Sequence, residues 1–189
     1  MIIYTRQGDK GTTTLTNGEV VSKADARIEY YGSLDELSSQ IGWLSALINE
    51  AMPTDFATEL SLMEQAQRLL FRMAADTELA QEHGIPLPAQ TDVDQLEQSI
   101  NDADALVGGL FRGFVLPGGH PLAAHAHVVC ALCRSTERLW HQLCYNESCR
   151  SLPIHEEMTM AYINRLSDFF YALAKKINYL THTDEKIAR

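Results

Sequence analysis

Residues 114–138 read FVLPGGHPLAAHAHVVCALCRSTER, and this stretch sets the expectation for the whole chain. Its first part, Leu116-Pro117-Gly118-Gly119, is a turn signal that ends any preceding element. Apolar residues then recur three and four positions apart, which predicts a helix from just past Pro121 to about Cys144. The residues of this apolar stripe are Leu122, Val128, Val129, Leu132 and Leu139.

Four further segments show helical spacing of their apolar residues. Helices are expected over residues 25–50, 54–80, 91–106 and 154–179, with prolines and glycines in most of the connections. In the first of them, Ser33 and Glu36 form a capping-box pattern that allows the helix to restart or kink there. No strand periodicity occurs beyond residues 2–5.

These elements predict an all-α fold, a single-domain five-helix bundle. Residues 1–24 form an N-terminal loop in this prediction, residues 25–180 form the helical bundle, and residues 181–189 form a loose polar tail.

Composition limits the functional classes. The formal net charge is -10, which argues against a general nucleic-acid binder because such proteins carry a basic surface. No apolar run is long enough to span a membrane, so no membrane association is expected. The first residues lack the charged and apolar regions of a secretory signal, so a cytoplasmic location is expected.

Arg134 and Arg138 are four residues apart, so they share one face of the predicted helix. Guanidinium groups bind phosphate oxygens with two parallel hydrogen bonds, and a pair of them suits a polyphosphate. In a chain with a strongly negative total charge, a local pair of cations is a stronger indication of an anion-binding site. The alternative interpretation is an ordinary ladder of surface ion pairs.

Residues 6–14 are polar and rich in glycine, and they contain the cations Arg6 and Lys10. Gly8 and Gly11 allow a tight turn close to a ligand, and residues 12–14 are threonines that offer hydroxyl groups. This composition fits a phosphate-binding loop, although the Walker A pattern is absent. The alternative is a hairpin or a flap without a ligand.

Two metal-binding alternatives follow from the same sequence. His125, His127, Cys130 and Cys133 form an H-x-H-x-x-C-x-x-C string, but a helix would place only His127 and Cys130 on one face. Reduced cysteines packed in the core are the favoured interpretation, and no metal site is assigned. A di-iron carboxylate bundle requires paired E-x-x-H motifs, and the sequence contains none.

Five separated pieces of the chain carry a resemblance. They are YTRQGDKGTT at 4–13, YGSLDEL at 31–37, FVLPGG at 114–119, R-x-x-E-R at 134–138 and YINRLSD at 162–168. In this order they resemble the PduO-type ATP:cob(I)alamin adenosyltransferases, also called corrinoid adenosyltransferases, over residues 2–178.

The resemblance implies a five-helix bundle that forms a homotrimer with active sites between subunits. It implies transfer of the 5′-deoxyadenosyl group of ATP to the cobalt of cob(I)alamin, with release of triphosphate and with Mg²⁺ on the phosphates. It also implies a flavoprotein reductant and an adenosylcobalamin-dependent acceptor enzyme as partners. Catalytic roles fall on Asp35, Phe114 and Arg134. The implied ATP-binding residues are Thr5, Arg6, Gln7, Gly8, Asp9, Lys10, Thr13, Thr14, Lys23, Arg134, Ser135, Thr136, Glu137, Arg138 and Asn164.

Elementary chemistry is compatible with these roles, because cobalt itself is the nucleophile and the protein has to position ATP and stabilise triphosphate. Phe114 matches the aromatic residue that occupies the lower face of the corrin. The sequence departs from the family at Cys130 and Ser135, where arginines are usual, so Asp35 lacks its expected arginine partner at position 130. These departures motivate an alternative, a relative that binds ATP and corrinoid with impaired transfer and acts in cofactor delivery or sensing.

Overall fold

The computed structural model describes residues 4, 6, 8–15, 18–74, 87–111, 113–145 and 157–188. Within them, a short hairpin precedes a bundle of helices. The elements are β1 (Thr12–Thr14), β2 (Val20–Ser22), α1 (Ala26–Ala51), α2 (Ala57–Ala74), α4 (Gln90–Val107), α5 (Pro121–Tyr145) and α6 (Glu157–Leu180). The predicted all-α five-helix bundle is confirmed, with the two-stranded hairpin as its only sheet in the described residues.

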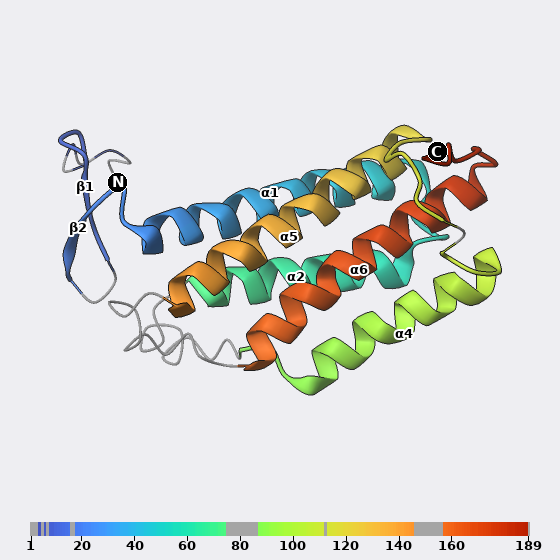
Figure 1. Cartoon of the computed structure of the whole chain (residues 1–189). Coiled ribbons are helices and arrows are strands. Elements are labelled where there is room, and N and C mark those ends of the chain that lie inside the picture. The colour runs from blue at the N-terminus through green and yellow to red at the C-terminus, as the bar shows by residue number, and fades with distance from the viewer. Residues whose placement is uncertain are drawn as a thin grey trace.

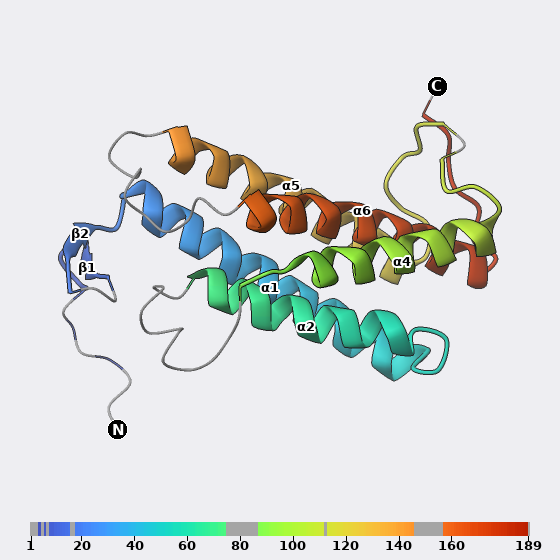
Figure 2. The same cartoon turned by 90° about the horizontal axis from the view of Figure 1, so that it is seen from below.

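Helices α5 and α6 form the centre of the bundle (Figures 1 and 2). Helix α5 packs against α6 and α1, α4 packs on α6, and α2 packs on α1. The loop before α5 and the C-terminal end of α6 therefore meet at one end of the bundle, and the hairpin lies at the other end. None of the described helices is long and apolar enough to cross a membrane.

Helix α1 begins at a side-chain cap and is continuous. Asp25 accepts a hydrogen bond from the backbone N–H of Arg27 at 2.9 Å, which satisfies one of the free donors at the helix start. The restart considered at Ser33 does not occur. Its hydroxyl instead donates to the carbonyl of Tyr30 at 2.7 Å, one turn back, so the serine bonds within a regular helix rather than capping a new one.

The apolar stripes of the sequence largely become the core. On α6 the apolar residues at helical spacing are buried, namely Ile163, Leu166, Phe170, Leu173 and Ile177. On α5 the predicted helix forms, and Val128 of its apolar stripe is 50% exposed because Val129 and Cys133 face inward with the small residue Ala126. The predicted end of the second helix and start of the last helix lie outside the described residues.

Strands β1 and β2 pair antiparallel, with Thr13 opposite Val21. An ion pair joins this hairpin to the bundle, because Arg27 of α1 contacts Glu19 at 2.8 Å. Residues 12–14 and 20–22 thus form a hairpin, and the glycine-rich turn at residues 8–11 precedes it.

The C-terminal residues differ from the expected loose tail. Val115 and Ile187 form an antiparallel bridge, and two backbone hydrogen bonds flank it. Lys175 of α6, which is 3% exposed, pairs with Glu185 in the same segment. A polar sequence alone does not reveal such pairing, because backbone hydrogen bonds depend little on side-chain type.

Candidate active site

One face of α5 lines a cavity of about 570 Å³ against α6 and the loop before α5. His127, Cys130, Arg134 and Arg138 follow one another at spacings of three and four, so all of them reach this cavity. Both arginines are exposed, and Arg138 donates to the hydroxyl of Ser135 at 3.3 Å. Their guanidinium groups are therefore accessible to an anionic ligand.

The aromatic residues Phe111 and Phe114 stand at the loop side of the same cavity. Phe114 is 78% exposed and Phe111 is 69% exposed, and their rings meet edge to face with centroids 5.8 Å apart. The two adjacent exposed phenylalanines form an apolar surface, and exposed apolar surfaces can mark places where a ligand or another protein binds.

Glu137 and Asn164 connect the arginine face of α5 to α6. The side-chain amide of Asn164 donates to the carboxylate of Glu137 at 2.9 Å. The structure thus brings together two residues that lie 27 positions apart in the sequence, and both belong to the implied ATP-binding set. This hydrogen bond restricts the rotamers of both side chains.

Ser135 and Thr136 lie on another side of α5. They line a smaller cavity of about 220 Å³ between α5 and α1, and Thr136 is almost completely buried. The structure therefore separates these two residues from the cavity that Arg134 and Arg138 line.

Cys130 and His127 form the buried floor of the larger cavity. Burial raises the pKa of the Cys130 thiol, and Asp168 adds to this while Arg134 opposes it. Burial also lowers the pKa of the His127 imidazole. Its Nε2 atom has no hydrogen-bond partner among the described residues, and its ring packs near Tyr171 with centroids 6.0 Å apart. Both groups are therefore expected to be neutral near pH 7.

Asp35 is exposed on α1 and does not line this cavity. The resemblance places an arginine partner for Asp35 at position 130. In this chain that position holds Cys130, which is buried. Within the described part of the chain, no ion pair involves Asp35.

Several lining residues were not among the predicted site residues, and Phe111, Asp168 and Tyr171 are three of them. Asp168 is held by Arg165 at 2.8 Å, and Arg165 also pairs with Glu97 of α4 at 2.9 Å. The positions of Asp168 and Tyr171, four and seven residues after Asn164, could have indicated them, because these spacings return to one helical face.

The side chain of Lys23 lies against the backbone of the N-terminal loop. A Cβ atom on Gly8 would lie 3.1 Å from the Nζ atom of Lys23, so the lysine rests against the bare backbone of the loop. The backbone N–H of Lys23 donates to the carbonyl of Gly11 at 2.9 Å. Thr5 and Gln7 lie outside the described residues.

The other predicted loop residues are mostly accessible. Arg6, Asp9, Lys10 and Thr14 are exposed, and Thr13 is half-buried within β1. The guanidinium of Arg6 lies over the ring of Tyr4, 5.6 Å from its centroid. No described residue of this loop or of the hairpin lines the arginine cavity, so the described residues of one chain do not bring the two halves of the predicted ATP site together.

The metal alternatives receive no support from the geometry. His125 lies 2.9 Å from the side chain of Gln40 and packs against Trp43, while Cys133 is buried in the core. In the part of the chain that the structure describes, no group of three or more histidine, cysteine or carboxylate side chains could hold a metal ion.

The family model described as Cobalamin adenosyltransferase matches residues 3–177. The chain belongs to the cobalamin adenosyltransferase family. Its match covers every described helix except the last three residues of α6, and it includes both halves of the predicted ATP site.

Curated members of the family cover the chain at moderate identity. The corrinoid adenosyltransferase PduO of Citrobacter freundii is 38% identical over 100% of this chain and 53% of its own length. The chain likewise spans 49% of the PduO protein of Salmonella typhimurium, so it spans about half the length of these relatives. A second Citrobacter freundii corrinoid adenosyltransferase is 36% identical over 92% of this chain and 93% of its own length.

Solved structures of the family share the fold. A variant of the PduO-type ATP:corrinoid adenosyltransferase from Lactobacillus reuteri, complexed with cobalamin and ATP, has a TM-score of 0.83 and 33% identity. The match covers 100% of this chain and 99% of that chain. A second variant of the same enzyme, complexed with ATP, has a TM-score of 0.80 at 33% identity and covers 99% and 100% of the two chains.

Proposed function

We propose that this protein transfers the 5′-deoxyadenosyl group of ATP to the cobalt of a reduced corrinoid, giving adenosylcobalamin and triphosphate. One observation carries the proposal, a single cavity that combines the exposed Phe114 with the guanidinium groups of Arg134 and Arg138. An apolar ring suits the face of a corrin, and paired arginines suit a triphosphate. The Lactobacillus reuteri relative, whose complex contains both cobalamin and ATP, supports this substrate pair.

The proposed reaction is a displacement at the ribose. The electron pair of cobalt(I) forms a bond to C5′ of ATP, the bond from C5′ to the triphosphate oxygen breaks, and triphosphate leaves with the bonding electrons. The protein supplies no covalent nucleophile in this step. This requirement is compatible with Cys130, whose buried thiol is held in its neutral, weakly nucleophilic form.

Stabilisation of the leaving triphosphate falls to the cations in this proposal. Arg134 and Arg138 would neutralise developing charge on the phosphate oxygens, and Lys10 and Lys23 would add to this from the N-terminal loop. Mg²⁺ fits as an ion that enters with ATP, because triphosphate supplies most of its oxygen ligands. Within the described residues, the protein itself offers no preformed group of ligands for it.

A homotrimer with sites between subunits is part of the proposal. The described residues of the N-terminal loop do not line the arginine cavity of their own chain, so in this proposal a second copy brings its loop to the cavity. The α1–α5 face also leaves Trp43 and Val128 59% and 50% exposed beside a largely apolar groove. An exposed apolar surface of this kind favours association.

The relative with impaired transfer remains a second candidate because of Cys130. A neutral thiol in the floor of the cavity replaces the cation that is usual at this position, so Asp35 of a neighbouring subunit would lack an ion-pair partner. The predicted flavoprotein reductant, the acceptor enzyme and the cytoplasmic location remain predictions, because their supporting observations come from sequence alone.

An anaerobic assay tests the proposal. Purified protein is mixed with chemically reduced cobalamin, ATP and Mg²⁺, and the corrinoid absorption spectrum and triphosphate release are followed together. Formation of adenosylcobalamin with an equal amount of triphosphate supports the transferase. Binding of both substrates without turnover overturns it in favour of the binding relative.

Cys130→Arg separates these candidates further. If the thiol impairs transfer, the arginine variant is expected to raise kcat about tenfold or more while ATP affinity stays unchanged. Equal turnover of the variant and the natural protein would show that the cysteine is compatible with full activity. Cys144→Arg, a substitution near the other end of α5, controls for added charge on the helix.

A further inference from the structure

Phe114 is held by its backbone rather than by side-chain packing. The carbonyl of Phe114 accepts a hydrogen bond from the N–H of Ala188 at 2.8 Å, and the N–H of Leu116 donates to the carbonyl of Lys186 at 2.7 Å. The C-terminal segment (residues 181–188) therefore pairs with the Phe114 segment (residues 113–117) on both sides of Val115. The Phe114 ring itself remains 78% exposed.

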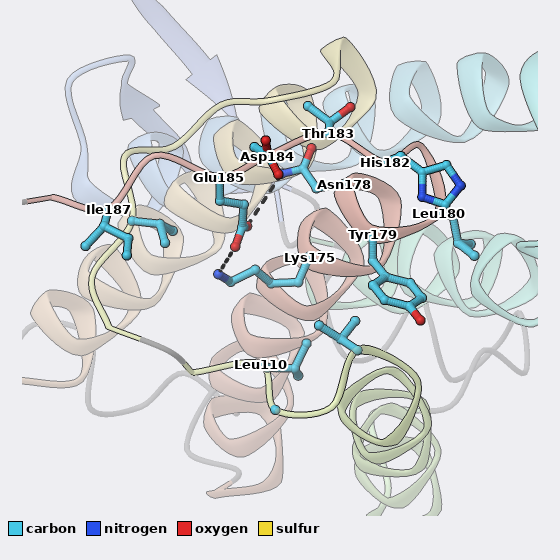
Figure 3. Close-up of a pocket in the computed structure, with 13 residues that line it drawn as sticks. Leu110, Lys175, Asn178, Tyr179, Leu180, His182, Thr183, Asp184, Glu185 and Ile187 are labelled. Carbon is cyan, nitrogen blue, oxygen red and sulfur yellow. Dashed lines mark hydrogen bonds and ion pairs between the residues drawn. The ribbon is translucent and has the colours of Figure 1, made fainter.

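The Phe114 segment separates two cavities. Val115 lines the arginine cavity and also a second cavity of about 650 Å³ behind it, which lies between the end of α4, the end of α6 and the C-terminal segment (Figure 3). A segment with open space on both sides has little packed structure to fix its position. Its backbone hydrogen bonds to the C-terminal segment fix its position in place of side-chain packing.

Two residues of α6 anchor this arrangement. Lys175 is 3% exposed, and its ammonium group pairs with the carboxylate of Glu185 in the C-terminal segment (Figure 3). A lysine buried to this degree requires a counter-charge, because loss of the partner leaves an uncompensated charge in a poorly solvated place. The same ammonium lies 5.5 Å from the centroid of the Tyr171 ring, which lines the arginine cavity.

Asn178 connects the anchor to the loop before α5. Its side-chain oxygen accepts a hydrogen bond from the N–H of His120 at 2.9 Å, and its side-chain nitrogen donates to the carbonyl of Gly118 at 3.1 Å. The same nitrogen lies 3.5 Å from Glu185. One turn of α6 thus holds both the loop that follows Phe114 and the segment that pairs with it.

We propose that Lys175, Glu185 and Asn178 are positioning residues, which set the place of Phe114 at the lower face of the corrin through the C-terminal segment and the loop before α5. This inference rests on the proposed function. The ring has to stay under the cobalt so that water or a nitrogen ligand does not occupy the lower axial position. A displacement of about 1 Å in such a group is enough to lower a rate severely.

Glu185→Gln tests the anchor, because it keeps the shape of the side chain and removes its charge. Asp184→Asn is the matched control, since Asp184 is the adjacent carboxylate, is exposed and lines the same cavity. The readouts are the fraction of bound cob(II)alamin in the four-coordinate form with ATP present, and kcat with cob(I)alamin. The expected result for Glu185→Gln is about a tenfold loss of kcat and at least a halving of that fraction, with ATP affinity unchanged.

A shortened chain that ends at Glu185 tests the pairing separately. It keeps the Lys175–Glu185 ion pair but removes Lys186 and Ala188, which form the two backbone hydrogen bonds to the Phe114 segment. The same loss of the four-coordinate form is expected while the melting temperature stays close to that of the full chain. This variant keeps the inference testable if Glu185→Gln does not fold.

Hydrogen exchange in the ligand-free protein makes failure of the inference distinguishable from failure of the proposed function. Both variants are expected to speed exchange of the Leu116 amide, and Asp184→Asn is not. A natural protein that neither binds corrinoid nor turns over would overturn the proposed function and, with it, the role assigned to Phe114. An active natural protein whose two variants keep its four-coordinate fraction and kcat would overturn this inference alone.

Discussion

Arg134 carries the most specific expectation at the scale of single residues. It lines the cavity, is exposed, and forms no ion pair in the part of the chain that the structure describes. Its planar guanidinium can hold two phosphate oxygens at once, whereas a lysine at the same position offers a single point charge. A lysine at position 134 keeps the positive charge but loses the two parallel hydrogen bonds, so this substitution isolates the contribution of bidentate binding.

Arg134→Lys is expected to lower kcat/KM for ATP by about tenfold or more, which corresponds to about 1.4 kcal/mol of transition-state stabilisation. Corrinoid affinity is expected to stay unchanged, because Phe114 is untouched. Steady-state kinetics with varied ATP at saturating cob(I)alamin measures this effect. Arg68→Lys is the control, since Arg68 is 73% exposed and pairs with Glu64 one turn away. Equal losses in both variants would contradict a specific role for Arg134.

For single residues, the sequence predicted the α5 residues of the arginine cavity better than the other residues that line it. Spacing alone grouped His127 with Cys130 and Arg134 with Arg138, because residues three or four apart share a helical face. Spacing could not show that Ser135 and Thr136 turn toward α1, since that depends on which side of α5 the core occupies. It also gave no reason to select Phe111, which comes from the loop.

The loop before α5 depends on one close approach at the scale of elements. Gly119 has a φ of +99°, and a Cβ atom there would lie 2.3 Å from the side-chain oxygen of Asn178. That oxygen already accepts a hydrogen bond from His120, so it has little freedom to move away. The glycine is therefore needed both for its backbone conformation and for its lack of a side chain.

Gly119→Ala is expected to destabilise the protein by about 2 to 4 kcal/mol, since it combines backbone strain with loss of the Asn178 hydrogen bonds. Gly32→Ala is the matched control. Gly32 lies inside α1, and a Cβ atom there would meet no atom within 4 Å, so a gain of about 0.5 to 1 kcal/mol is expected from helix propensity. Urea denaturation measures both. Equal stability of the two variants would contradict the close contact.

Helices could be predicted well because their signals are local. Asp25 caps α1 and Gly108 ends α4 in the left-handed conformation, and both residue types mark helix ends in sequence. The bridge between Val115 and Ile187 joins segments more than 70 residues apart, and nothing in either segment identifies the other. A polar segment with no local signal is therefore expected to be a loose tail, and only the folded structure shows its partner.

The whole molecule is expected to be a trimer in solution, with a mass about three times the chain mass of 21.1 kDa. Trp43→Glu should shift the mass toward that of a single chain, because it introduces a charge on the exposed α1–α5 face. Light scattering after size-exclusion chromatography measures this change. Phe71→Glu is the control, since Phe71 is an aromatic residue of α2 with 65% exposure. A natural chain that elutes as a monomer would contradict the trimer.

Stability of the whole molecule is also expected to depend on pH in a defined window. Burial lowers the pKa of His125 and His127 from the ordinary value of 6.5. Their contribution to the free energy of unfolding is therefore complete above pH 6.5 and is lost as the pH falls. Burial raises the pKa of Cys130 and Cys133 from the ordinary value of 9.0. Their contribution to the free energy of unfolding is therefore complete below pH 9.0 and is lost as the pH rises. The raised pKa of Tyr30 acts in the same direction.

Thermal unfolding followed by circular dichroism is therefore expected to give the highest melting temperature between about pH 7 and 9. Between pH 7 and 5.5 the melting temperature is expected to decrease, because both imidazoles resist protonation in the folded protein more than in the unfolded chain. His127→Gln, whose side chain stays neutral, should reduce that decrease, whereas His182→Asn should preserve it because His182 is exposed. A melting temperature that stays constant from pH 7 to 5.5 would mean that neither buried imidazole resists protonation in the folded state.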